Sequence, residues 1–197
     1  MKRPRVLKAE IKGESYMQIG TITIDTKRLK LRRISLNDAQ SIYTNLKSDE
    51  RVTDNLVKGI HINLEETLDM VKEIISQYEN RSFYHWGIEL IESKELIGLI
   101  DLFHFESNET KCSVGYEIGF NWWNKGYGTE ALKAVVDFAF NHIRVNEISA
   151  AHNTDNPASG RIMEKVGMQK DCIVKDMITN AKGQSKDCAI YHIKNNL

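Results

Sequence analysis

The hydrophobic positions of the chain follow two periods, one typical of strands and one typical of helices. Alternation of apolar and polar residues predicts one or two strands in "TITIDTKRLKLRRI". It predicts one strand each in "SFYHWGIELI", "ELIGLIDLFHF", "KCSVGYEIGF" and "EISAAH", and a closing pair in "MQKDCIVKDMI" and "SKDCAIYHI". Apolar residues spaced by three and four predict helices over about 36–46, 64–78, 126–140 and 157–166. Because consecutive strands follow consecutive helices without strict alternation, this order indicates an α+β fold.

Local signals mark where several of these helices begin and end. Asn63 is expected to cap the second helix, and Glu66 completes a capping box. Asn156 followed by Pro157 predicts an N-cap with proline in the first helical turn. Gly167 is expected to end that helix in the left-handed conformation.

Composition and charge are those of a single globular domain. The 197 residues suffice for one core, which we place in residues 21–197, with residues 1–20 as a polar N-terminal extension. Lys plus Arg and Asp plus Glu number 27 each, so no net field favours nucleic acid or an acidic membrane as a partner. No apolar run is long enough for a signal-peptide core or a membrane helix, which favours a cytoplasmic location.

The cysteines and histidines carry no redox or metal motif. Cys112, Cys172 and Cys188 are odd in number, widely spaced and without a CxxC pair, so reduced and packed thiols are expected. The six histidines lack the spacing of a zinc site, and no metal is predicted.

The stretch "NWWNKGYGTEAL" has the chemistry of an anion site. Gly126 and Gly128 leave the backbone bare directly before a predicted helix, whose first N–H groups have no partner within the helix. The helix dipole adds partial positive charge there, and Lys125 can add a mobile charge at the rim. The turn therefore suits a phosphate, although a turn that merely joins strand to helix has the same composition.

The order of elements discriminates among the phosphate ligands that such a turn could hold. "GYGTEA" matches the dinucleotide pattern G-x-G-x-x-G/A, but that fingerprint belongs on the first strand of a doubly wound parallel sheet. Here it follows three strands of antiparallel type. The P-loop pattern G-x-x-x-x-G-K-[ST] is absent from the sequence. Dinucleotides and P-loop nucleotides are therefore disfavoured.

Two segments of the chain, in the order expected for the family, resemble motifs of the GNAT superfamily of N-acetyltransferases. "WNKGYGTEAL" is similar to its acyl-CoA signature Q/R-x-x-G-x-G/A. "NTDNPASGRIMEKVGM" is similar to the N-x-x-N-x-x-S-x-x-φ-x-E-K-x-G-F/M segment of the Rim-type branch, the ribosomal-protein N-acetyltransferases and their relatives. "TKRLKLRRISLNDA" and "ELIGLI" match that branch too, so the resemblance spans about residues 21–193. It implies a GNAT-like mixed, mostly antiparallel central sheet of about seven strands flanked by about four helices.

The resemblance implies acetyl-CoA as the acetyl donor and assigns its binding residues. Pantetheine would pair with the free edge of a strand that splays from its neighbour, and the pyrophosphate would bind amides of the glycine turn. On this basis the cofactor contacts are Ile118, Gly119, Phe120, Lys125, Gly126, Tyr127, Gly128, Thr129, Asn153, Asn156 and Ser159.

The resemblance also suggests residues that act on the reacting groups. Ser159 aligns with the serine that the branch uses near the thiol, as a proton donor or as a hydrogen-bond partner of sulfur. A backbone N–H near Ile118 or Gly119 is the expected oxyanion donor. Tyr191 matches a tyrosine common in the final strand, with core packing as its main role and a hydroxyl near the thiol as the alternative.

This sequence departs from the family pattern at two positions. Trp123 stands where the wider superfamily has Gln or Arg, although the branch commonly has Trp there. Ser113 replaces a frequent glutamate, so an acid–base role of that glutamate cannot be carried over. The general base is then open between Glu117, His104 and Glu106, and an α-amino acceptor could also lose its proton to water.

The predicted activity is transfer of an acetyl group from acetyl-CoA to a primary amine by direct attack in a ternary complex. A ping-pong route through Cys112 or Cys172 is disfavoured, because neither has a base beside it in the sequence. The acceptor is a protein N-terminus or a small-molecule amine, selected chiefly by segments 47–62 and 176–186. The alternative function is a CoA-binding sensor or interaction module that has lost catalysis, and a homodimer is compatible with either.

Overall fold

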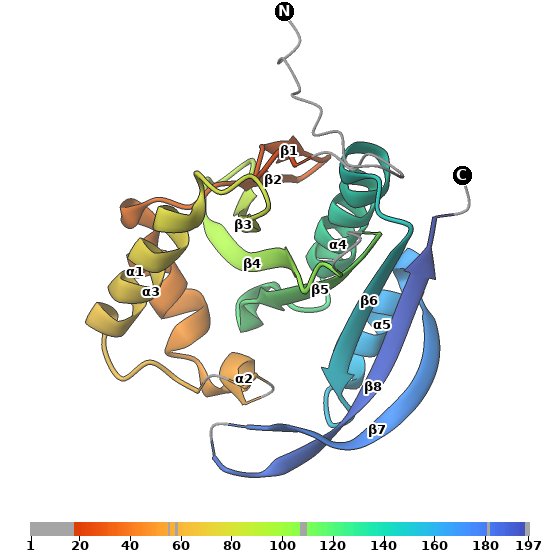
Figure 1. Cartoon of the computed structure of the whole chain (residues 1–197). Coiled ribbons are helices and arrows are strands. Elements are labelled where there is room, and N and C mark those ends of the chain that lie inside the picture. Colours follow the sequence, from red (N-terminus) through yellow and green to blue (C-terminus); the bar gives the residue numbers. More distant parts are fainter. Residues whose placement is uncertain (1–17, 55, 58, 107–109, 181, 196–197) are drawn as a thin grey trace, which may run out of the picture.

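A single mixed sheet of eight strands runs through the molecule (Figure 1). The computed structural model describes residues 18–54, 56–57, 59–106, 110–180 and 182–195, so most of the predicted extension lies outside the described residues. The spatial order is β1-β2-β3-β4-β5-β6-β8-β7, with β5 and β6 parallel and all other neighbours antiparallel. The bounds are β1 Ile24–Asp25, β2 Leu29–Arg32, β3 Tyr84–Leu90, β4 Leu96–Phe103, β5 Lys111–Ile118, β6 Glu147–Asn153, β7 Gln169–Thr179 and β8 Ser185–Lys194.

The mostly antiparallel α+β fold predicted from the sequence is confirmed, with one strand more than expected. The extra strand arises because "TITIDTKRLKLRRI" folds into two short paired strands, β1 and β2. No helix among the described residues is long and apolar enough to cross a membrane.

Two groups of helices cover opposite faces of this sheet (Figure 1). One group contacts β4, and the other contacts β2, β5, β6 and β7. The first contains α1 Ala39–Ile42, the π-helical segment η2 Tyr43–Lys47 that continues it, and α3 Leu64–Gln77; the second contains α4 Tyr127–Phe138 and α5 Pro157–Val166. A further short helix, α2 (Glu50–Thr53), lies within the polar segment 47–62, where the sequence predicted no element.

The helix ends follow the local signals closely. Asn63 accepts the Glu66 N–H at 3.0 Å, as an N-cap should. The Glu66 carboxylate accepts the N–H of Ile62 at 3.0 Å instead of that of Asn63, so the capping box is displaced by one residue. Asn156 is the N-cap of α5, with proline in its first turn. Gly167 ends α5 with a φ of 97°, in the left-handed region that favours glycine.

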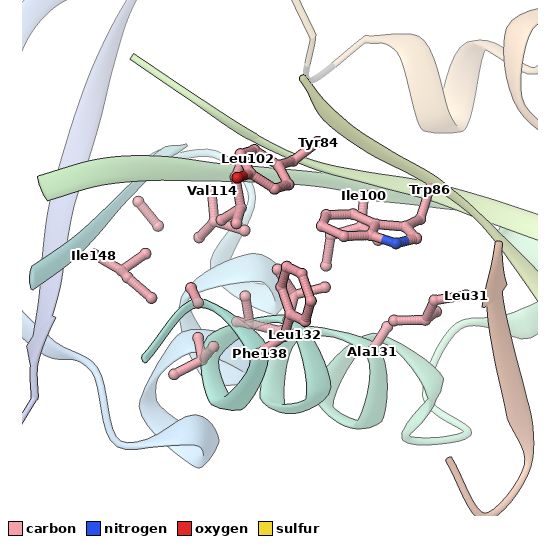
Figure 2. Close-up of a cluster of buried hydrophobic side chains, with 14 of the residues drawn as sticks. Leu31, Tyr84, Trp86, Ile100, Leu102, Val114, Ala131, Leu132, Phe138 and Ile148 are labelled. Carbon is pink, nitrogen blue, oxygen red and sulfur yellow. The ribbon is translucent and has the colours of Figure 1, made fainter. Parts of the chain in front are cut away.

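The larger of two hydrophobic cores lies between α4 and the sheet. Figure 2 shows Leu132 and Phe138 of α4 pointing toward Trp86 and Ile100 on the strands. These four side chains are at most 4% exposed, and full burial of such groups contributes roughly 1.5–3 kcal/mol each. The smaller core lies on the opposite face, under α1, η2 and α3. The central strands are therefore packed from both faces, and they provide a rigid support for the site described next.

Candidate active site

The parallel strands β5 and β6 pair for only three residues and then separate. The pairs run from Lys111 with Glu147 to Ser113 with Ser149. Beyond them a pocket of about 470 Å³ is lined by both strands and by the first turns of α4 and α5. The splay implied by the family resemblance is thus present. The predicted site residues that line this pocket are Glu117, Ile118, Gly126, Tyr127, Gly128, Thr129, Asn153, Asn156 and Ser159.

The backbone of β5 presents the N–H of Ile118 to this pocket. Gly119 donates its own N–H to the Ile97 carbonyl of β4 at 2.8 Å. Because successive residues of a strand direct their N–H groups to opposite sides, the Ile118 N–H points away from β4. Trp123 Nε1 donates to the Ile118 carbonyl at 2.7 Å, which leaves the N–H as the ligand-binding group of that residue. Gly119 was the other expected oxyanion donor, and its N–H is already bonded within the sheet.

The glycine turn begins α4 and faces the same pocket. Gly126 is the N-cap of the helix with a φ of 81°, a conformation that glycine adopts without strain. Its carbonyl accepts the N–H of Glu130, whereas the N–H groups of a first helical turn have no partner within the helix. Residues 127–129 carry such groups along the pocket wall. The side chain of Lys125 is exposed and does not contribute to that wall.

Arg28 brings a cation to this turn from the beginning of β2. Its guanidinium carbon lies 4.4 Å from the centroid of the Tyr127 ring, and its Nη1 donates to the Lys125 carbonyl at 3.0 Å. Its Nε pairs with the Glu130 carboxylate at 2.7 Å. Burial opposes ionisation of Glu130, but hydrogen bonds from Thr26 and Arg28 outweigh burial and lower the pKa of Glu130. Sequence reasoning missed Arg28, because "TKRLKLRR" was recognised only as a family likeness.

Ser159 and Tyr116 meet on another wall of the pocket. The Tyr116 hydroxyl lies 2.8 Å from Ser159 Oγ and donates to the Ser159 carbonyl at 3.0 Å. Burial raises the pKa of Tyr116, so this hydroxyl keeps its proton at neutral pH. Asn156, the N-cap of α5, accepts the Ser159 N–H at 3.4 Å. Sequence reasoning assigned no role to Tyr116, although alternation places it on the same face of β5 as Ile118.

Asn153 and Tyr191 are both buried, but only Asn153 lines the pocket. Asn153 lines it, and its side chain accepts the Asp155 N–H at 2.9 Å. Tyr191 is 3% exposed, and its hydroxyl donates to the Glu164 carboxylate at 3.2 Å. Its ring centroid is 5.6 Å from that of His152, which does line the pocket. Tyr191 therefore packs behind the site, with His152 between it and the cavity.

Glu117 is the one of the three candidate bases that the fold brings to the pocket. Its Oε1 lies 2.5 Å from Lys47 Nζ, and each of these side chains is 10% exposed. Its Oε2 is buried and has no hydrogen-bond partner among the described residues. His104 is exposed beyond the end of β4, and Glu106 is half exposed, 4.0 Å from Lys111 Nζ. Neither of these two borders the cavity.

A second pocket of about 390 Å³ adjoins the first and shares Trp123 with it. It lies between α2 and the turn that joins β7 to β8, the two segments expected to select the acceptor. Lys182 of that turn pairs with Asp54, the C-cap of α2, at 2.7 Å. Phe120, predicted as a cofactor contact, lines this second pocket, with the Arg51 guanidinium 3.7 Å from its ring centroid.

Sequence comparison places this fold and pocket in a known family. The profile of the acetyltransferase (GNAT) domain matches residues 28–169, more than half of the chain. The chain belongs to the GNAT acetyltransferase family. The N-acetyltransferase YoaA of Bacillus subtilis, itself uncharacterised, is 29% identical over 170 residues, which cover 86% of this chain and 95% of YoaA. The [ribosomal protein uS5]-alanine N-acetyltransferase of Escherichia coli is 27% identical over 121 residues, covering 61% and 60% of the two chains.

Solved structures of GNAT enzymes share the fold at low sequence identity. An acetyltransferase of this family from Bacillus anthracis superposes with a TM-score of 0.78 at 24% identity, covering 88% of this chain and 98% of its own. The microcin C7 self-immunity acetyltransferase MccE, solved with acetyl-CoA and AMP, gives 0.78 at 14% identity, with 86% and 94% covered. Together with the relatives of the Rim type, these similarities confirm the resemblance and the class of enzyme that it implied.

Proposed function

We propose that this acetyltransferase moves an acetyl group from acetyl-CoA to a primary amine, by direct attack of the amine in a ternary complex. One observation carries the proposal: a single pocket is lined by residues 127–129 at the start of α4, by Glu117 on β5, and by Ser159 and Tyr116 along its wall. A donor whose phosphates bind at one end of this pocket and an acceptor amine that enters at the other end would meet in its middle.

The donor side of the pocket suits a pyrophosphate followed by an extended chain. The first amides of α4 would bind the pyrophosphate, with Arg28 adding charge at the turn. Ile118 would pair with pantetheine through its N–H, or donate the same N–H to the oxyanion. The hydroxyl pair of Tyr116 and Ser159 would then hold or protonate the departing sulfur.

The amine side of the pocket ends at Glu117. An amine reaches it protonated at neutral pH and must lose a proton before it can attack a carbonyl. Glu117 lines this end of the cavity, and its buried Oε2 is an acceptor without a donor among the described residues. The second pocket gives the acceptor room to extend beyond Trp123, which is compatible with a protein N-terminus or a small-molecule amine.

The cysteines support direct attack over a covalent acetyl-enzyme. Burial raises the pKa of Cys112 to about 12, which disfavours the thiolate that a nucleophile requires. Cys172 is exposed on β7, at the edge of the sheet away from β5. Among the described residues, no group of three or more His, Cys, Asp or Glu side chains could hold a metal ion.

The test measures thiol release from acetyl-CoA over a panel of alkylamines and peptides with free N-termini. Initial rates at several concentrations of both substrates should give intersecting double-reciprocal lines. Parallel lines, with an acetylated enzyme formed in the absence of acceptor, would exclude direct attack. Tight CoA binding without turnover on any acceptor would instead identify a sensor.

A substitution in the gap between β5 and β6 tests the location of the donor. Ala151 is exposed on β6 and lines the pocket, so Ala151→Trp should block it and abolish CoA binding measured by calorimetry. Lys170→Trp adds the same side chain to an exposed position of β7 and should leave binding unchanged. Unaltered affinity in a folded Ala151→Trp protein would show that CoA binds elsewhere.

A further inference from the structure

Four ionisable side chains from four elements gather on the sheet face that carries Glu117. The others are Lys47 of η2, His85 of β3 and Asp101 of β4. Asp101 lies opposite His85 on one neighbouring strand and opposite Gly115 on the other. Glu117 follows Gly115 by two residues on the same face. Glu117 is therefore the diagonal neighbour of Asp101, and such neighbours lie about 7 Å apart.

The glycine opposite Asp101 keeps the approach between the two carboxyl groups open. A Cβ at Gly115 would lie 3.0 Å from Asp101 Oδ1 and 3.1 Å from the ring of Phe103. Both distances are tighter than ordinary van der Waals contact, so the Asp101 carboxyl group occupies the place that a side chain at 115 would need. As a result, no side chain of β5 stands between Asp101 and Glu117.

The same cluster contains a buried acceptor atom that has no donor. Lys47 is hydrogen-bonded to Oε1 of Glu117, while Oε2 is buried and unpartnered among the described residues. Buried acceptors without donors are uncommon in folded proteins and call for an explanation. The Glu117 side chain is nine-tenths buried and also borders the pocket, so an acceptor amine entering there is the donor we infer for Oε2, once its ammonium group displaces the atoms that cover this oxygen.

We propose that Glu117 is the catalytic base of this enzyme. Asp101 is a positioning residue that acts through Glu117, by accepting the proton that Glu117 has removed from the amine. The proposal rests on the acetyl transfer proposed above and names a protonated primary amine as the acceptor. One N–H proton of R–NH₃⁺ passes to Glu117, and the freed nitrogen lone pair forms the bond to the acetyl carbonyl carbon. The two carboxyl groups are not hydrogen-bonded to each other, so Glu117 passes that proton to Asp101 through a water in the gap over Gly115, and the proton then leaves to solvent.

The remaining bonds and protons of this reaction balance. The carbon–sulfur bond breaks with its electron pair going to sulfur, and the new amide nitrogen loses a second proton. That proton ends on the thiolate, by way of the hydroxyls of Tyr116 and Ser159. One ammonium ion and one thioester therefore give one amide, one thiol and one proton released to solvent.

The charges that face Asp101 suit it to this exchange. Burial and the negative charge of Glu117 raise the pKa of Asp101 to about 7, against the opposing charge of Lys47. Burial and Lys47 lower the pKa of His85 to about 4, so His85 is neutral at neutral pH. Asp101 can therefore gain and lose a proton near neutral pH. Ser113, which replaces a glutamate frequent in the branch, cannot do so.

The test compares two acceptors that differ in their need for a base. An alkylamine arrives protonated, whereas an O-alkylhydroxylamine is unprotonated at neutral pH. Asp101→Asn should lower kcat with the alkylamine about 10- to 100-fold, and kcat with the O-alkylhydroxylamine less than about twofold. The KM for acetyl-CoA should not change. Glu117→Gln should show the same difference between the two acceptors.

The pH profile adds a readout that a merely structural role would not move. With the alkylamine, kcat of the wild type should fall as the pH decreases below about 7, because protonated Asp101 cannot accept a proton. Asp101→Asn should lack this decrease, and Asp101→Glu should restore both the decrease and most of the rate. Asp171→Asn removes a carboxylate on β7 that pairs with His192, and as the matched control it should behave like the wild type.

The outcomes separate this proposal from the function on which it rests. Equal losses with both acceptors in Asp101→Asn would assign Asp101 a structural role and overturn the relay. An unchanged kcat and pH profile would overturn it as well. If the wild type releases no thiol with either acceptor, the acetyl transfer fails, and the relay fails with it.

Discussion

Replacing Asp101 with asparagine should shift the free energy of unfolding in favour of the variant as the pH rises, with a net gain in stability at pH 8. Burial, followed by the charge of Glu117, raises the pKa of Asp101 to about 7 from the value of 3.8 for an unperturbed aspartate. The folded state thus holds this proton more tightly than the unfolded state does. The stability that depends on it is fully present below about pH 4 and is lost as the pH rises through about 7.

The magnitude follows from the same shift. One pKa unit corresponds to about 1.4 kcal/mol, so the ionised Asp101 lowers the free energy of unfolding by about 4 kcal/mol at pH 8. At pH 5 the cost is only about 1.5 kcal/mol, because pH 5 lies little more than one unit above the pKa of the carboxyl group in the unfolded state. A buried asparagine amide without partners costs roughly 1–3 kcal/mol, but this penalty does not vary with pH.

Urea unfolding of the wild type and Asp101→Asn at pH 5 and pH 8 measures this effect directly. Between the two pH values, the difference in unfolding free energy should move by about 2–3 kcal/mol in favour of the variant. The constant amide penalty cancels in this comparison. Asp171→Asn, at a half-exposed position, should change by much less. A difference between wild type and Asp101→Asn that is the same at both pH values would refute the burial argument.

Three other substitutions test further parts of the site. Arg28→Ala should raise KM for acetyl-CoA about 3- to 10-fold, since partly exposed ion pairs contribute roughly 1 kcal/mol. The same substitution should leave KM for S-acetylpantetheine unchanged, because this donor lacks the nucleotide phosphates. Equal effects on both donors would contradict a role of Arg28 at the phosphates. Tyr116→Phe should lower kcat about tenfold or more at constant KM in steady-state kinetics, because Ser159 loses its hydroxyl partner. Gly160→Ala would place a methyl group 2.6 Å from His152 Nε2 and should cost about 1–3 kcal/mol in urea unfolding, unless α5 shifts without penalty.

Features that depend on neighbours in the chain were predictable from the sequence. Asn156 and Gly167 bound α5 as expected, because a cap is formed within a few residues of the helix end. The glycine turn at Gly126 begins α4 for the same local reason. The sequence also predicted the closing strands β7 and β8, which are joined by a turn and pair with each other.

The charged groups around the pocket were not predictable, because their partners come from distant segments. Arg28 reaches Glu130 across 102 positions, and Lys47 reaches Glu117 across 70. Alternation in "ELIGLIDLF" gives no reason to treat Asp101 differently from a charge on a solvent-facing strand position. Asp101 is partly buried because η2 packs against β4, and no local sequence pattern predicts this long-range contact.

Alternation along β5 also separates the two halves of the proposed reaction. Tyr116 and Ile118 point to the face of α4 and α5, where Ser159 lies, while Glu117 points to the opposite face, where Asp101 lies. A shift of one residue in the pairing of β5 would exchange these faces. The register is fixed before the splay by the pairing with β6 and throughout by the pairing with β4. One strand therefore holds a hydroxyl toward the thiol and a carboxylate toward the amine at a spacing set by the backbone. Direct attack requires this fixed spacing, since both substrates must be aligned at the same moment, whereas a covalent acetyl-enzyme would not need it.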